Sequence, residues 1–244
     1  MLEICISCYN STDDLRETLK SLTDAIRSKI VSVSVAHRVF ENDMQCVKKV
    51  CLDFGVRYFS SDDKGVYQGF NRLLSEVDAE YFCFFGAGDL LNKNFQFSKL
   101  GELKGADVIC NGIVFVNEDR VIVRRWDCGA VGRLNLGWMP PHTGLVLRTK
   151  FARNVGFFDE NFKISGDYDY VLRCFSATSD VHFTGEILTL MKNGGISTDP
   201  SNVFKKLKED YVVAKRHLGW PKLAVFLKRL RKLHQLTFLG IKIE

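Results

Sequence analysis

The sequence contains no long apolar run. Nowhere in its 244 residues do about 18 uncharged apolar residues follow one another, so we expect no membrane-spanning helix. The first residues, Met1-Leu2-Glu3, have neither the basic segment nor the apolar stretch of a signal peptide. We therefore expect a cytoplasmic protein.

Proline is scarce, and no residue type dominates. The chain has 4 Pro beside 19 Gly, and 46% of its residues are hydrophobic and 26% charged. This composition excludes collagen-like and disordered proteins and is typical of a folded globular protein. The length suits one α/β domain with an appendage or two small domains, because α/β domains often reach roughly 200 to 250 residues undivided.

A second cysteine pair at zinc-ligand spacing is also missing. The 8 Cys include Cys5-x-x-Cys8, but this pair lies in the apolar, strand-like run Ile4-Cys5-Ile6-Ser7-Cys8. Buried, reduced thiols are favoured over a zinc or redox site, because free Cys behaves as a small hydrophobic residue.

No internal repeat occurs, and no linker rich in Pro, Gly or Ser precedes about residue 195. The basic residues are concentrated at one end. Between residues 204 and 244 eleven Lys or Arg stand against three acids, although the whole chain has a net charge of only +5. We therefore expect a folded domain over 1–198 and a basic segment over 199–244 that suits an anionic surface, either a membrane or nucleic acid.

Short apolar runs alternate with amphipathic stretches over most of the chain. This pattern is typical of βα units around a mostly parallel sheet. Strands are expected over 2–8, 31–35, 56–59, 81–85, 144–147 and 181–191. Helices are expected over 15–26, 47–54, 66–77 and 165–175, and a hairpin is expected over 108–126.

Three expected strands end in residues that could bind a ligand, at the edge where open α/β sheets usually do so. Tyr9 can stack on a flat ring or simply pack. Asp63 can cap the next helix, whereas the charge of Lys64 suits a phosphate or holds Asp63 in place. In Gly86-Ala87-Gly88-Asp89 the glycines admit a ligand, and the carboxylate of Asp89 can hold a divalent cation on a diphosphate, although such a run is also a plain turn signal.

Two further acids, Asp167 and Asp169, fall in the helix expected from Ser165 onward. Residues two positions apart on a helix point in different directions. One carboxylate can therefore face a cleft, while the other caps the helix or pairs with Arg173, four residues beyond Asp169.

Together these segments resemble the inverting glycosyltransferases of family 2, which have the GT-A fold and build bacterial surface polysaccharides. The resemblance covers roughly residues 2 to 195, and six ordered segments are much more specific than any one alone. The matching segments are Tyr9-Asn10, Asp63-Lys64-Gly65-Val66-Tyr67-Gln68-Gly69-Phe70-Asn71, Gly86-Ala87-Gly88-Asp89, Met139-Pro140-Pro141-His142, Gly156-Phe157-Phe158-Asp159-Glu160 and Gly166-Asp167-Tyr168-Asp169. The resemblance implies a Rossmann-like, mostly parallel central sheet with flanking helices.

The resemblance also implies roles for particular residues. Tyr9 would stack on the nucleotide base, Asp63 would contact the nucleoside, and His142 would lie near the diphosphate unless it is a structural residue. Asp89 would hold a divalent cation, Mg²⁺ or Mn²⁺, and Asp167 would be the base that deprotonates the acceptor hydroxyl. The implied substrate-binding residues are Tyr9, Asp63, Lys64, Gly65, Asn71 and His142.

The sequence departs from the family pattern at two places. One carboxylate, in Gly88-Asp89, stands where two are usual. The acid that usually ends the second strand and reads the base should fall near Ala36-His37, where there is none, so that His37 or Glu41 would have to replace it. We expect a UDP-sugar as donor, with the nucleotide left open by this second departure.

The C-terminal segment predicts a basic amphipathic helix. Its apolar residues, from Trp220 to Leu236, recur at helical spacing, and five cations lie among them without an acid. We expect this helix to hold the protein peripherally on the inner, anionic face of the plasma membrane. The alternative is that its Leu face packs on the body. Nucleic-acid binding is not expected, because no interleaved aromatic and basic motif accompanies the charge.

The sequence therefore predicts an inverting, metal-dependent glycosyltransferase. It would move a sugar from a nucleotide sugar to a hydroxyl of a lipid-linked glycan in polysaccharide biosynthesis. The rival hypothesis is a nucleotide-sugar-binding or scaffold protein of the same fold with weakened catalysis, suggested by Gly88 and the missing acid. A nucleotidyltransferase is disfavoured, because the chain lacks a Gly-rich basic triphosphate loop. The presence of both Asp89 and Asp167 favours the enzyme.

Overall fold

The structure is a computed structural model, and it describes residues 2–9, 11–38, 44–61, 65–129, 131–192 and 200–234. The strands are β1 (Leu2–Tyr9), β2 (Val31–Arg38), β3 (Arg57–Ser61), β4 (Tyr81–Gly86), β5 (Leu90–Leu91), β6 (Val108–Val116), β7 (Ile122–Trp126), β8 (Leu145–Arg148) and β9 (Val181–Lys192). The helices are α1 (Thr12–Ser21), α2 (Thr23–Arg27), α3 (Met44–Asp53), α4 (Val66–Glu76), α5 (Ser98–Glu102), α6 (Thr149–Val155), α7 (Gly166–Ala177), α8 (Val203–His217) and α9 (Pro221–His234). Short 3₁₀ turns are η1 (Val131–Leu136), η2 (His142–Gly144) and η3 (Pro200–Asn202).

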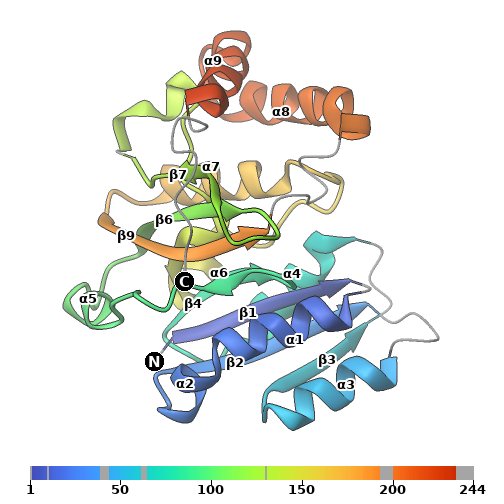
Figure 1. The fold of residues 1–244 in the computed structure, drawn as a ribbon. Helices are drawn as coiled ribbons and strands as arrows, with labels where there is room; N and C mark the ends of the chain where they lie inside the picture. The colour runs from blue at the N-terminus through green and yellow to red at the C-terminus, as the bar shows by residue number, and fades with distance from the viewer. Residues whose placement is uncertain are drawn as a thin grey trace.

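The described strands form one mixed sheet in the order β3-β2-β1-β4-β8-β6-β9-β5, with β7 paired to β6 (Figure 1). The pairs among β3, β2, β1 and β4 are parallel, as expected for βα units. In the other half only β6 and β9 are parallel, whereas β8 and β7 run antiparallel to their neighbours. The expectation of a mostly parallel sheet therefore holds for the first half of the sheet only.

Two hydrophobic clusters cover the two faces of the sheet. Helices α1, α2 and α3 contribute to one cluster, and α4, α6 and α7 contribute to the other. Successive side chains of a strand point to opposite faces, so Cys5 and Cys8 of β1 fall in different clusters. All eight Cys are free thiols and all but Cys46 are buried, which confirms the expected reduced cysteines.

The helix expected over 15–26 is broken at Leu22 into α1 and α2. Two side-chain hydroxyls at the break bond to backbone carbonyls of the preceding turn. Ser21 Oγ donates to the Thr18 carbonyl at 2.7 Å, and Thr23 Oγ1 donates to the Leu19 carbonyl at 3.2 Å. Such bonds compete with the helix ladder and bend or end helices, which explains the break.

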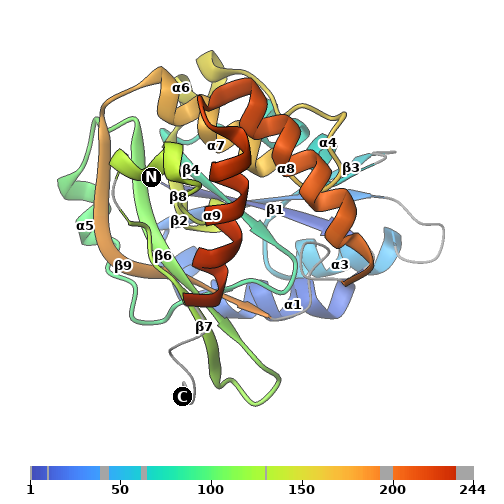
Figure 2. The same ribbon diagram turned by 90° about the horizontal axis from the view of Figure 1, so that it is seen from above.

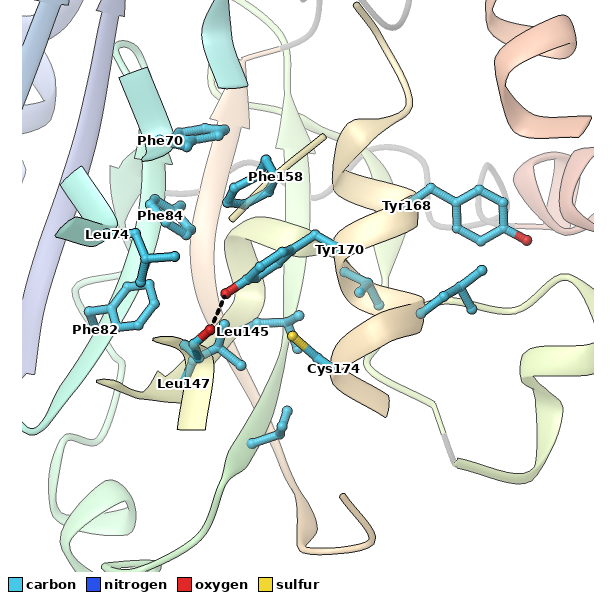
Figure 3. Close-up of a cluster of buried hydrophobic side chains, with 14 of the residues drawn as sticks. Phe70, Leu74, Phe82, Phe84, Leu145, Leu147, Phe158, Tyr168, Tyr170 and Cys174 are labelled. Atoms are coloured by element: carbon cyan, nitrogen blue, oxygen red, sulfur yellow. Dashed lines mark hydrogen bonds between the residues drawn. The ribbon is translucent and has the colours of Figure 1, made fainter. Parts of the chain in front are cut away.

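Helix α7 is enclosed on two sides. Tyr170 points toward the sheet, where it stacks on Phe158 with ring centroids 4.1 Å apart and donates a hydrogen bond of 3.4 Å to the Ala152 carbonyl (Figure 3). Tyr168 lies on the other side of the helix and points away from Phe158 and Phe84 (Figure 3). Helix α7 therefore lies between the sheet and the elements that pack against Tyr168.

The C-terminal helices α8 and α9 lie on that side. Seen from above, both helices cross in front of α7 (Figure 2). Lys228 of α9 places its Nζ 3.4 Å from the centre of the Tyr168 ring, and Ala224 is fully buried. In the described part of the chain no helix is both long enough and apolar enough to cross a membrane. The boundary expected between 198 and 199 falls outside the described residues.

Candidate active site at the carboxyl edge of the sheet

Tyr9 ends β1 at the carboxyl edge of the parallel strands, and its side chain is 51% exposed. Arg38 ends the neighbouring β2 opposite Tyr9. Its guanidinium lies 5.1 Å from the centre of the Tyr9 ring and donates to the Tyr9 hydroxyl at 3.2 Å. The edge thus offers an exposed aromatic ring whose orientation is fixed by a cation, which is suitable for stacking a flat base.

Ala36 and His37, where the sequence suggested a base-reading residue, are both buried. His37 Nδ1 lies 3.3 Å from the hydroxyl of Tyr58 in β3, so the ring is part of the sheet packing. Glu41 lies outside the described residues. Arg38, which the sequence reasoning passed over, is the polar residue of β2 beside Tyr9. Arg38 is the first charged residue after the run Val31 to His37, which is the sequence signal that could have identified it.

Asp89 lies in the turn that follows β4, and it is buried, with 6% of its surface exposed. Its Oδ2 accepts a 2.7 Å hydrogen bond from the Gly86 N–H, and the Gly86 carbonyl accepts from the Asp89 N–H at 3.1 Å. Gly88 has a φ of +100°, a conformation that favours glycine. Burial raises the pKa of Asp89 to about 7, and the Gly86 N–H opposes this rise.

Burying an ionisable carboxyl without a cation beside it is costly. Among the described residues no group of three or more His, Cys, Asp or Glu side chains gathers as metal ligands. Within that part of the chain, Asp89 therefore has no cluster of protein ligands around it. A single carboxylate does fit Mg²⁺-type sites, where the remaining ligands are substrate phosphates and water.

The segment between β3 and α4 carries two of the expected donor-binding residues, Asp63 and Lys64, and both lie outside the described residues. Gly65 precedes α4 in an extended conformation with φ −174°, and no described residue lies within 4 Å of the place where a Cβ would stand. Its backbone is therefore open on that side, as a substrate contact would require.

Asn71, expected to bind substrate, is engaged within the protein. Its Oδ1 accepts from the Phe158 N–H at 2.7 Å, and its Nδ2 donates to the Phe158 carbonyl and to Glu160 Oε1, at 3.1 and 2.9 Å. The amide thus holds the segment around Phe158, which forms one wall of the candidate site. Direct contact of Asn71 with a substrate stays a prediction.

His142 begins η2 and is enclosed by the rings of Phe70, Phe84 and Phe158, whose centroids lie 5.3 to 5.6 Å from its own. Burial lowers the pKa of His142, and the charge of Asp167 opposes this effect. Among the described residues its Nε2 has no hydrogen-bond partner. An unsatisfied buried nitrogen is costly, so a ligand oxygen or a water in this place would stabilise it.

Asp167 and Asp169 point to different surroundings, as their spacing predicted. Asp169 is buried, and its carboxylate accepts from Arg173 Nε at 2.9 Å and lies 2.8 Å from His217 Nε2. Asp167 lies in the first turn of α7, and among the described residues its carboxylate accepts a hydrogen bond only from the Tyr168 N–H, at 2.8 Å. Burial lowers the pKa values of His142 and of Lys228 in α9 and raises that of Tyr67, and the charge of Asp167 acts to raise all three, so Asp167 lies among these three residues.

The structure places four of the expected site residues in two groups. Tyr9 and Asp89 end neighbouring strands, because β1 and β4 pair side by side up to Ser7 and Gly86. Asp167 and His142 gather around the first turn of α4, through Tyr67 and Phe70. Tyr67, Arg38 and Glu209 are further residues of this region that the sequence reasoning did not select.

No protein-family model matches the chain. A protein of Rickettsia conorii described as an uncharacterized glycosyltransferase is 23% identical over 210 residues, which cover 77% of this chain and 33% of that protein. A protein of Rickettsia typhi with the same description is 22% identical and covers 98% of this chain and 76% of that protein. The chain thus spans about a third of the length of the first relative.

Two solved structures have a similar fold at low identity. TarS of S. aureus, in complex with UDP-GlcNAc, matches 87% of this chain and 66% of its own with a TM-score of 0.65 and 12% identity. A mannosyltransferase from Pyrobaculum calidifontis, in complex with GDP-Man and Mn²⁺, matches 93% of this chain and 68% of its own with a TM-score of 0.62 and 12% identity. These structures confirm the expected GT-A fold, and the sequence relatives are described as glycosyltransferases.

Proposed function

We propose that this protein is an inverting glycosyltransferase that uses a nucleotide-sugar donor. The observation that carries the proposal is the position of Asp167: unlike Asp169, it makes no ion pair with a described residue, and its charge is felt at Tyr67 and His142. The sequence relatives described as glycosyltransferases support the same activity.

The donor would bind along the carboxyl edge of β1 and β4. Tyr9 would stack on the base while Arg38 holds its ring, and the open backbone of Gly65 would lie beside the nucleoside. Asp63 and Lys64 belong to the same segment by sequence. TarS with UDP-GlcNAc and the mannosyltransferase with GDP-Man support a nucleotide sugar as the donor class, and we propose a UDP-sugar.

Asp89 would hold a divalent cation, Mg²⁺ or Mn²⁺, together with the diphosphate oxygens. When bound, such a cation neutralises the charge that develops on the departing nucleoside diphosphate. The protein contributes a buried carboxylate held by the Gly86 N–H in a glycine turn. Nε2 of His142, which has no hydrogen-bond partner among the described residues, would bond to a phosphate oxygen.

Asp167 would accept the proton of the acceptor hydroxyl as its oxygen attacks the anomeric carbon. The bond from that carbon to the diphosphate oxygen breaks on the opposite face, so the configuration inverts. Asp169 is less suited to this role, because Arg173 and His217 already occupy its carboxylate.

We further propose that the acceptor is lipid-linked and that α8 and α9 rest on an anionic membrane. The two acids of these helices, Glu209 and Asp210, are not exposed, whereas Lys205, Lys208, Lys215, Lys222 and Arg229 are. Exposed apolar side chains lie among these cations: Val203, Phe204, Tyr211, Val212, Trp220, Leu223, Phe226 and Leu230. We call this surface the outer face of α8 and α9.

The sequence left two alternatives for the C-terminal helix, membrane binding and packing on the body, and each suits a different face of α9. Ala224 and Lys228 pack inward, while Leu223, Phe226 and Leu230, three and four residues apart, form one exposed stripe. Each exposed Lys or Arg near an anionic surface contributes about 1 kcal/mol, and the apolar stripe adds burial in the interface. This surface would bring the active site to a lipid-linked glycan.

The replacement Asp167→Asn tests the activity. The amide preserves shape but cannot take up the acceptor proton, so kcat should fall by about 100-fold or more while the donor affinity measured by calorimetry stays unchanged. Asp53→Asn, an exposed acid at the end of α3, is the matched control. Proton NMR of the product should show inversion at the anomeric carbon.

Normal turnover of Asp167→Asn would assign the base to another residue. A wild-type protein that binds nucleotide sugars but transfers to no acceptor in a glycolipid panel would instead support the rival hypothesis of a binding protein.

A further inference from the structure

The loop that leads into α7 donates three consecutive backbone N–H groups to one carboxylate. Glu209, in the second turn of α8, accepts from Lys163 at 3.2 Å, from Ile164 at 2.8 Å and from Ser165 at 2.9 Å. These residues end two positions before Asp167. A side chain more than forty residues farther along the chain thus binds the backbone that carries the proposed base.

The same loop is held from the opposite side by α4. The Tyr67 hydroxyl donates to the Ile164 carbonyl at 2.7 Å. The Tyr67 ring also lies against Gly166, where a Cβ would approach its Cε2 to 2.7 Å. Residues 163–166 are therefore fixed between a tyrosine of α4 and a carboxylate of α8.

The next residue of α8 extends these contacts to α9. Asp210 accepts from Ser165 Oγ at 2.8 Å and from Lys228 Nζ at 3.0 Å. Lys228 in turn lies over the Tyr168 ring, on the turn of α7 that contains Asp167. Glu209 and Asp210 thus join α9 to both the loop and the first turn of α7.

Local capping does not explain this arrangement. Ser165 precedes α7, but its side chain makes no capping hydrogen bond to the first turn. A free helix N-terminus leaves N–H groups unsatisfied and attracts negative charge. In this protein Asp167 binds one N–H of the first turn, and Glu209 of α8 binds the N–H groups of the three residues before the helix, so a separate element also holds the start of α7.

We propose that Glu209 is a positioning residue for the general base Asp167. By binding three successive N–H groups it fixes the backbone from which Asp167 projects, so that the carboxylate meets the acceptor hydroxyl in a reactive geometry. This inference rests on the proposed function, in which Asp167 is the base. It gives the C-terminal helices a part in catalysis apart from membrane binding.

The kinetic test uses the full-length Glu209→Gln protein, with Glu118→Gln in the exposed β6–β7 turn as control. The amide keeps one acceptor oxygen but loses the charge and the second acceptor. A displacement of about 1 Å can lower a rate by about 100-fold, so we expect kcat to fall by about 10- to 100-fold with donor affinity unchanged. Equal kcat values for wild type and Glu209→Gln would overturn the proposal.

A second comparison separates positioning from general destabilisation. In the Asp167→Asn background, Glu209→Gln should cause no further loss in single-turnover rate, because a residue that acts through the base has nothing left to position. An additional loss of the same size in both backgrounds would overturn the proposal. If Asp167→Asn itself transfers normally, the proposed function fails, which is a different result.

Hydrogen exchange tests the structural part without any activity. The amides of residues 163–165 should exchange faster in Glu209→Ala than in wild type, while those of β1 and β4 stay protected. Unchanged exchange at 163–165 would show that Glu209 does not hold the loop and would overturn the proposal. Faster exchange throughout the chain would assign Glu209 to overall stability, which also contradicts it.

Discussion

Asp89→Asn should both stabilise the folded protein at neutral pH and remove its cation-dependent donor binding. The amide fits the same place, because its oxygen can still accept the hydrogen bond from the Gly86 N–H that Asp89 accepts at 2.7 Å. It carries no charge, so it avoids the cost of an ionised group with 6% exposure. It is also a poorer ligand for a divalent cation than a carboxylate.

The size of the stabilisation follows from the raised pKa. Burial moves the pKa of Asp89 from 3.8 to about 7, and each pKa unit corresponds to about 1.4 kcal/mol, so the upper limit is about 4 kcal/mol. Between these two values the folded state holds a proton that the unfolded state has released. The stability of the wild type therefore falls as the pH rises through this range, while Asp89→Asn is unaffected.

Urea unfolding of both proteins at several pH values between about 4 and 8 measures this difference. The gap in the free energy of unfolding should be near zero at about pH 4 and should grow until about pH 7. Asp53→Asn should show no such growth. A constant gap at every pH would mean that Asp89 ionises normally, and the argument from burial would be wrong.

Calorimetry with UDP and Mn²⁺ tests the cation at the same residue. Wild-type affinity should rise as Asp89 ionises near pH 7, whereas Asp89→Asn should bind UDP equally with and without Mn²⁺. Retained Mn²⁺ dependence in the variant would remove Asp89 from the cation site.

Two further predictions concern the C-terminal helices. In urea unfolding, Gly137→Ala should destabilise the protein by about 1 to 3 kcal/mol more than Gly55→Ala. Both glycines have positive φ, but only a Cβ at Gly137 would meet α9, 2.0 Å from the Ala224 carbonyl oxygen. Equal losses of stability would mean that α9 does not pack there. The double replacement Leu223→Ser and Phe226→Ser should reduce co-sedimentation with anionic vesicles, and 1 M salt should weaken wild-type binding because the Debye length shortens to about 3 Å. Leu52→Ser, at an exposed leucine of α3, is the control, and binding that ignores lipid charge would argue against the outer face as the docking surface.

The C-terminal segment shows what the sequence predicts and what the tertiary structure adds. The apolar period of residues 220–236 predicts a helix and states which residues share a face, because this depends only on 3.6 residues per turn. It does not state what each face meets. In the structure Lys228, one of the five cations of this segment, points inward and donates to Asp210. Truncation at Gly219 would therefore remove part of the packed interior as well as the outer face.

The sequence by itself determined the local elements and the order of the motifs. Continuous apolar runs predicted β1 and β4, the polar residues between 116 and 122 predicted the β6–β7 hairpin, and the glycines before Asp89 predicted the turn after β4. These features depend on neighbours within a few residues, so the sequence alone is enough to predict them.

Only the tertiary structure decided which residues meet across long separations. It showed that Arg38 rather than His37 accompanies Tyr9, that Asn71 holds the segment at Phe158, and that Glu209 binds the loop before Asp167. Each of these contacts depends on strand order and helix packing, which bring together positions 29 to 87 residues apart, as between Tyr9 and Arg38 or between Asn71 and Phe158. Periodicity specifies a face but not its partner, and the partner is fixed only when the sheet and its helices assemble.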